Sequence, residues 1–143
     1  MSNITTYKTP LEFAGLTAKQ LIRRHILLSD MADGHVPVAL IDSTEIDGQF
    51  EEAHDTHDLS DYINEFRTSG IETGLPAPSS RHYECEHVAR CLIGGAWVGW
   101  LHWHGGGKHG EPEAMPWLDD ATLLEVDEKP VLSVERTFRV VEE

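Results

Sequence analysis

Cysteine is scarce in this chain of 143 residues, which has two, Cys85 and Cys91. If both lie on one strand, six residues at about 3.3 Å each separate their Cα atoms by about 20 Å. A disulfide needs Cα atoms within about 7 Å of each other, so no bridge within the chain is expected. A secretion signal is also missing, because the first residues show no basic start followed by an apolar run. Reduced thiols and the missing signal together predict a cytoplasmic protein.

Long apolar runs and basic residues are equally rare. No window approaches the roughly 18 consecutive apolar residues of a membrane helix, so we expect no membrane association. Lys and Arg total 11 against 25 acids, giving a net charge of −14, and neither occurs between residues 25 and 65. Such a surface repels phosphate backbones, which argues against nucleic-acid binding through a basic patch. The charge is compatible with a basic protein partner, or simply with solubility.

Local patterns predict a single domain over 1–143 with an α+β fold. We expect a two-layer arrangement, in which an antiparallel four-stranded meander sheet packs with two helices. The apolar run 35–41 is a candidate for an additional short edge strand. The helices are predicted at 18–31 and 60–68, and the strands at 81–93, 96–104, 121–127 and 131–141. An acidic mobile loop is expected at about 43–57 and a glycine-rich loop at 105–116.

Specific residues carry these predictions. Thr17 and Gln20 form a capping box at the start of the first helix, and His25 falls on its apolar face, which favours a packed, hydrogen-bonded core histidine over a ligand. Gly94-Gly95 suits a two-residue hairpin turn. In the last strand, alternate residues are apolar, which is typical of a strand with one buried face; these are Leu132, Val134, Phe138 and Val140.

The Gly94-Gly95 turn also sets a register for the hairpin. With Ile93 opposite Ala96, the side chains on one face would include a square of soft ligands suited to zinc, formed by Cys85, His87, His102 and His104. The alternative is that this face is core, since most of its other residues are apolar. The spacing is not an established zinc motif, and a slip of one residue destroys the square. We therefore expect no bound metal and no cofactor.

Residues 97–117 are the most unusual segment, with four tryptophans, three histidines and five glycines in 21 residues. An aromatic strand here runs into the sequence GGGKHGEP. From Trp97 to Phe138 the chain resembles small uncharacterised proteins encoded by phages, prophages and plasmids. The resemblance implies a mobile-element origin and no particular activity. It also implies that the positions of His102 and His104 are often occupied by tyrosine, which weighs against a metal site.

The glycine-rich loop lacks the features of a phosphate loop, because His109 follows Lys108 and prolines prevent an immediate helix. Its glycines would still allow an anion nest beside Lys108, or the loop is a solvated hairpin connection. No Ser or Cys lies in a recognisable nucleophile motif. We predict that the loop and its flanks form the binding surface, made of Trp103, His104, Lys108, His109, Glu111 and Trp117.

Two functions fit this pattern. The first is a non-catalytic binding protein, an accessory product of a mobile element acting through protein contacts, with the aromatic hairpin as hot spot and the acidic segment as electrostatic complement. Acidic inhibitors that mimic DNA belong to this class. The alternative is a small enzyme or a small-molecule or anion binder that uses Lys108, His109 and Glu111 in a pocket beside Trp103 and Trp117.

Overall fold

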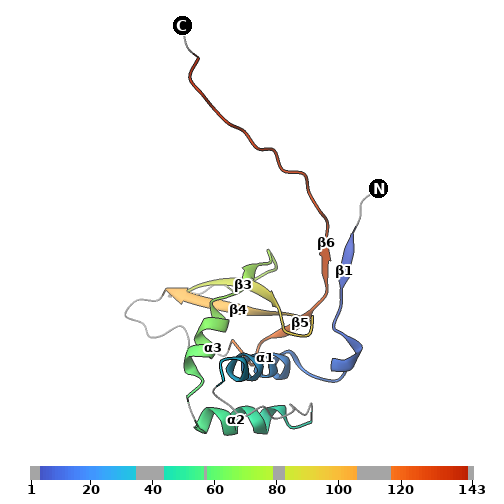
Figure 1. Cartoon of the computed structure of the whole chain (residues 1–143), viewed down its shortest axis with the longest axis vertical. Helices are drawn as coiled ribbons and strands as arrows, with labels where there is room; N and C mark the ends of the chain where they lie inside the picture. Colours follow the sequence, from blue (N-terminus) through green and yellow to red (C-terminus); the bar gives the residue numbers. More distant parts are fainter. Residues whose placement is uncertain (1–3, 35–43, 57, 79–82, 106–116, 142–143) are drawn as a thin grey trace.

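The computed structural model describes residues 4–34, 44–56, 58–78, 83–105 and 117–141. Along the described chain the elements follow one another as shown in Figure 1. They are β1 (Thr5–Tyr7), a short 3-10 helix (Leu11–Phe13), α1 (Ala18–Ala32), α2 (Ile46–Thr56), α3 (Ser60–Arg67), β2 (Ile71–Glu72), β3 (Tyr83–Cys91), β4 (Trp97–Gly105), β5 (Thr122–Leu124) and β6 (Val126–Glu128).

The first helix begins where its capping residues predict. The Thr17 hydroxyl accepts the Gln20 backbone N–H at 3.2 Å, and the Gln20 side chain accepts the Thr17 N–H at 3.0 Å. These reciprocal bonds satisfy two backbone donors at the helix start. His25 is buried on the apolar side of α1, as predicted for a core histidine. The helix at Ser60–Arg67 is also confirmed.

The acidic mobile loop predicted at 43–57 is wrong over most of its length, because residues 46–56 form α2. Ile46, Phe50 and Ala53 are buried along this helix at helical spacing. Arg23 of α1 binds the Asp47 carboxylate at 2.7 Å and lies 5.0 Å from the centre of the Phe50 ring. The acidic residues of this segment therefore lie on a helix that packs on α1.

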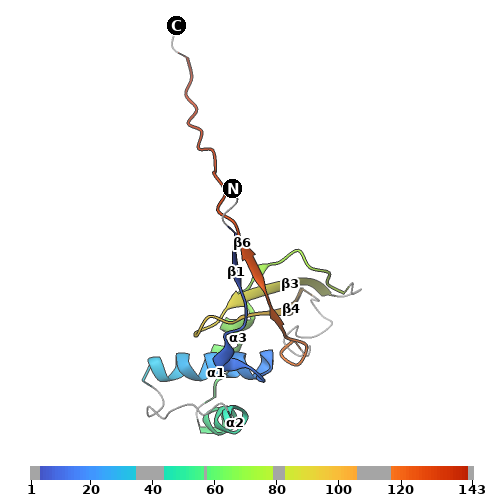
Figure 2. The ribbon, with the colours of Figure 1, turned by 90° about the vertical axis from the view of Figure 1, so that its right-hand side faces the viewer.

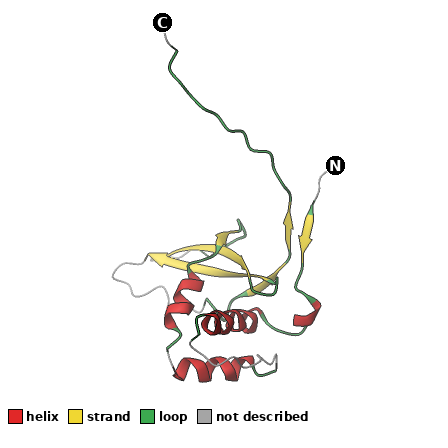
Figure 3. Ribbon diagram, viewed as in Figure 1, coloured by secondary structure: helices red, strands yellow, loops and turns green. Residues whose placement is uncertain are grey.

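Strands β2, β3, β4 and β5 form an antiparallel sheet in meander order, which confirms the predicted α+β class. The helices gather on one side of this sheet, as the colouring of Figure 3 makes clear. In both Figure 1 and Figure 2, α1 lies between the sheet and α2. The described part of the chain thus has one α-helix more than the two expected.

The core fills the space between the sheet and helices α1 and α3. Trp100 of β4 is its largest fully buried side chain, and its indole N–H donates to the Arg67 carbonyl at the end of α3. The ring of Phe66 lies 4.9 Å from the Trp100 ring, and Trp117 packs against both. Within the described segments, no helix is both long and apolar enough to cross a membrane.

The hairpin register differs by one residue from the predicted one. Leu92 pairs with Ala96, with a 2.7 Å bond from the Leu92 N–H to the Ala96 carbonyl. Ile93 does not pair across the hairpin, because side chains of α1 form hydrogen bonds with its backbone N–H and carbonyl groups. Its N–H donates to His25 Nδ1 at 3.0 Å, and its carbonyl accepts from Arg24 at 3.1 Å. The loop between the paired residues therefore contains three residues instead of two.

The last predicted strand, 131–141, is wrong as a member of the sheet. The segment predicted at 121–127 is divided between β5, which pairs with β4, and β6, which pairs with β1 in a separate two-stranded ribbon. Pro130 follows with no N–H to donate, so it ends the pairing. Residues 129–141, here called the tail, then run away from the body of the molecule (Figure 1). The short edge strand expected at 35–41 lies outside the described residues.

Candidate functional site

The observed register divides the β3–β4 hairpin into two faces. Cross-strand partners share a face, and successive residues alternate between faces. The inner face, which carries Val88, Val98 and Trp100, packs on the helices. The outer face points away from them. Its half-buried side chains are Tyr83, Cys85, His87, Trp97, Leu101 and Trp103.

This division removes the predicted zinc square. Cys85 lies opposite Trp103, and His87 lies opposite Leu101, on the outer face. His102 and His104 lie opposite Glu86 and Glu84, on the inner face. The one-residue difference in register therefore places the two halves of the square on opposite sides of the sheet. Both cysteines are free, in agreement with their positions six residues apart on one strand.

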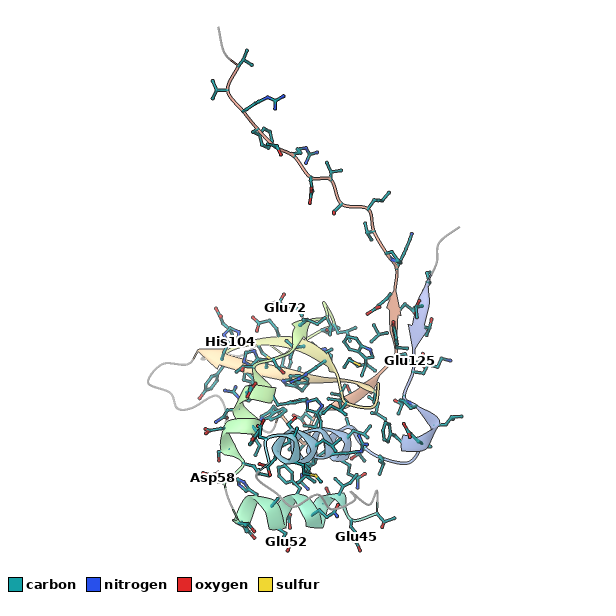
Figure 4. All side chains as sticks on the ribbon, viewed as in Figure 1. Glu45, Glu52, Asp58, Glu72, His104 and Glu125 are labelled. Carbon is teal, nitrogen blue, oxygen red and sulfur yellow. The ribbon has the colours of Figure 1, made fainter. Side chains whose placement is uncertain are left out.

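A different polar cluster lies at the end of the inner face, beyond the core. His104 Nε2 lies 2.6 Å from a Glu86 carboxylate oxygen, and His104 Nδ1 lies 3.4 Å from a Glu84 oxygen. Figure 4 shows His104 toward the end of the hairpin farthest from its turn. These three residues offer oxygen and nitrogen ligands within 4.8 Å of one another, which suits a divalent cation.

The geometry of the cluster nevertheless favours polar contacts among these three side chains themselves. The two ring nitrogens of His104 face different carboxylates, whereas a single ion bonds only one nitrogen of an imidazole. An ion at Nε2 would leave the Glu84 contact in place, and an ion at Nδ1 would displace it. The cluster is complete without a metal: the imidazole bridges Glu84 and Glu86 and ties the ends of β3 and β4 together.

His102 borders this cluster, with its ring centre 5.2 Å from that of His104. Partial burial lowers the pKa of His102, and the charges of Arg67 and His104 lower it further against the opposing influence of Glu86. Arg67 also donates to the Trp103 carbonyl at 3.2 Å. These interactions favour the neutral form of His102. Its neighbours could not be predicted from the sequence, because they depend on the register.

The outer face is largely apolar and aromatic. Tyr83 and Trp103 make an edge-to-face contact with ring centres 6.5 Å apart. His87 bonds the Thr73 hydroxyl at 2.7 Å and lies over Gly99, where a Cβ atom would come within 2.6 Å of the imidazole. Gly99 is thus required for this close approach. In Figures 1 and 2 no helix covers the outer face.

The structure does not bring the predicted binding residues together. Trp103 lies on the outer face and His104 on the inner face. Trp117 is 5% exposed and belongs to the core, so it is not part of a surface hot spot. The pocket predicted beside Trp103 and Trp117 is absent from the described structure, because these two rings lie on opposite sides of the sheet. Lys108, His109 and Glu111 lie outside the described residues.

A shallow cavity opens between α1, α3 and the hairpin turn, with a volume of about 310 Å³. Among the described residues of the segment 97–117, which are 97–105 and 117, none lines it. Tyr62 on its wall donates to Asp33 at 2.5 Å, which raises the pKa of the phenol to about 12. His25 on the same wall accepts the Ile93 N–H. Both polar groups have structural partners, and the Ser29 hydroxyl on the same wall donates to the His25 carbonyl at 2.9 Å.

The tail is the most exposed apolar segment of the described chain. Its side chains project into solvent along its whole length (Figure 4). The exposed fraction of its large apolar side chains runs from 71% to 99%, for Val131, Leu132, Val134, Phe138, Val140 and Val141. The alternation was visible in the sequence, but its interpretation as part of the sheet hid this exposure.

Comparison with known proteins gives no relative, since no family model, curated protein or solved structure matches this chain.

Proposed function

We propose that this protein is a non-catalytic binding protein that acts through protein contacts, as an accessory product of a mobile genetic element in the cytoplasm. The exposed tail is the observation that carries this proposal. It would supply the contact strand, while the acidic body would favour a basic partner or a basic segment of one. The two free cysteines support a reducing compartment.

Exposed apolar side chains are ordinary when they are scattered, but a contiguous row marks a binding surface. Complete burial of one such side chain contributes about 1.5–3 kcal/mol. The four on one side of the tail, Leu132, Val134, Phe138 and Val140, would therefore contribute about 6–12 kcal/mol, to which main-chain hydrogen bonds would add, before association costs of the order of 4–15 kcal/mol. A partner that covers most of the tail can therefore bind with useful affinity.

The tail also has the form of a recognised protein ligand. An extended segment adds main-chain hydrogen bonds to a partner's sheet, and its alternate side chains fill pockets. The odd-numbered positions Ser133, Glu135 and Thr137 are polar, and Leu132 and Val134 lie on the other side of the strand. This two-sided pattern needs a partner on one side and tolerates water on the other.

Capture from the native host tests the proposal. Full-length tagged protein is compared with Leu132→Asp/Phe138→Asp, which places charge on the apolar side of the tail. The matched control is Ser133→Asp/Thr137→Asp, which adds the same charge to the polar side. We expect the wild type and the control to retain the same proteins, identified by mass spectrometry, and the first variant to lose them. Equal capture by all three would show that the tail is not the contact element.

The enzyme or small-molecule alternative now has less support. Trp103 and Trp117, which that alternative places beside one pocket, lie on opposite sides of the sheet, and Lys108, His109 and Glu111 lie outside the described residues. No second function is favoured by a specific contact in the described structure.

A further inference from the structure

We infer that the partner of the tail is a second copy of this chain, whose outer sheet face receives it. The inference rests on the proposed function, since it names the partner for the same tail. In this arrangement each copy places its tail on the outer face of the other, so that the two contacts are equivalent by two-fold symmetry.

The first argument is that the described chain presents two apolar surfaces that it leaves incompletely covered, one half-buried and one almost fully exposed. A sheet that packs helices on one face is stable in water when its other face is polar or is covered. Here the outer face carries Trp97, Leu101 and Trp103, and the tail presents Leu132 and Phe138 with nearly full exposure. Each surface supplies the cover that the other needs.

The two surfaces also match in length. Strands β3 and β4 have nine residues each. The apolar side of the tail runs over the nine positions from Leu132 to Val140. At about 3.3 Å per residue, both extend for about 26 Å between their first and last Cα atoms. The tail can therefore cover the whole length of the hairpin.

Charge favours the same pairing. The tail carries Lys129, Arg136 and Arg139 against the single acid Glu135, in a chain whose net charge is −14. A locally basic strand is attracted to an acidic body, whereas two acidic bodies alone repel each other. Arg136 lies on the apolar side of the tail, where its guanidinium can stack on an aromatic ring. The rings of Tyr83 and Trp103 on the outer face offer such positions.

The tail is directed away from its own sheet. Its root, β6, is paired with β1, and the Thr6 hydroxyl donates to the Asp127 carboxylate at 2.6 Å. Pro130 restricts the preceding residue to an extended conformation. In the two views of Figures 1 and 2 the tail continues the direction of β6 away from the body. Covering its own outer face would require the chain to reverse direction just after this ribbon.

Native cysteines on the outer face allow a direct test in the full chain. One copy carries Cys85→Ser, Cys91→Ser and Phe138→Cys, so its only thiol is on the tail. A second copy, lengthened by a tag, keeps Cys85 and Cys91 and the native tail. After mixing and mild oxidation, we expect a disulfide-linked product with the summed mass, joined through one of the outer-face cysteines.

The matched control moves the tail thiol to the polar side, with Thr137→Cys in place of Phe138→Cys. We expect this control to cross-link several times more slowly. Light scattering on the purified wild type should give the mass of a dimer, and Leu132→Asp/Phe138→Asp should give that of a monomer. These tail positions are exposed in the single chain, so the variants should keep its circular dichroism spectrum and melting temperature.

A monomeric wild type with no cross-link between copies would overturn the second-copy inference. So would equal cross-linking of the two tail thiols, or a tail thiol that links only to cysteines of its own chain when these are restored. The proposed function survives these results if capture from the host still depends on the apolar side of the tail, and it fails with them if capture does not.

Discussion

His25 should make the stability of the fold depend on pH in the mildly acidic range. The side chain is 6% exposed, and its pKa is lowered from 6.5 to about 4, first by burial and then by the charges of Arg90 and Arg24. Its Nδ1 atom accepts the Ile93 N–H, so the folded state needs this nitrogen without a proton. Protonation would break that bond and place a charge in the core.

The direction and magnitude of the pH effect on stability follow from the difference between the His25 pKa in the folded state and in the unfolded state. The unfolded chain binds a proton on this residue near pH 6.5, and the folded chain does so near pH 4. Between these values the unfolded state holds more protons, so the free energy of unfolding falls as the pH is lowered. At 1.36 kcal/mol per pH unit, the total loss is about 3 kcal/mol. Above pH 6.5 and below pH 4 this residue contributes no further pH dependence.

Urea unfolding at a series of pH values measures the effect. In His25→Asn the amide oxygen can take the place of Nδ1 and accept the Ile93 N–H, but the group no longer titrates. The variant should be less stable at pH 7 because it loses the edge contact with Phe66. Its stability should nevertheless decline less on acidification than that of the wild type, by about 3 kcal/mol between pH 6.5 and 4.

The wild type must be compared with the His25→Asn variant because other groups also titrate in this pH range. Burial lowers the pKa of His87 and His102, and carboxylates titrate near pH 4. These groups remain in both proteins, so the difference between the two curves isolates His25. Parallel curves for wild type and His25→Asn would refute the assignment of a neutral, buried histidine at this position.

Two further predictions concern the sites named from the sequence. Purified protein should carry no stoichiometric zinc by elemental analysis, because the register separates Cys85 from His104. One zinc per chain that is lost in Cys85→Ser/His104→Ala would overturn this prediction. Zinc that is lost in His104→Ala but kept in Cys85→Ser would instead lie at the cluster of Glu84, Glu86 and His104. Lys108→Ala and His109→Ala should shift stability by less than about 0.5 kcal/mol and weaken partner capture. Unchanged capture at an unchanged melting temperature would remove the glycine-rich loop from the binding surface.

Local signals were the predictable part of this fold. The capping box at Thr17 and Gln20 depends on residues three apart, so the sequence alone predicts where α1 begins. Helix α2 carried an equally local signal in Ile46 and Phe50, but the surrounding acids favoured a loop interpretation. A narrow apolar stripe is enough when a neighbouring helix covers it, and here α1 does so.

The hairpin register shows why the candidate site could not be predicted. Two glycines predict a turn, yet whether the loop contains two or three residues depends on which groups bind Ile93. His25 and Arg24, nearly 70 positions earlier in the chain, bind its N–H and carbonyl. A contact of that range has no signature in the turn itself. It decides which face His104 occupies, and with it the neighbours of every polar residue on the hairpin.

The tail marks a different limit of sequence interpretation. Alternation predicts that one side of a strand will be covered, and it is silent about whether the cover belongs to the same molecule. In this chain β1 pairs with β6, and the place beside β5 that the last strand was expected to fill remains without it. The single chain therefore leaves the apolar side of the tail without the cover that the alternation predicts. An intermolecular contact would satisfy the same pattern that the intramolecular sheet was expected to satisfy, so the alternation and the exposure both support the binding strand that we propose.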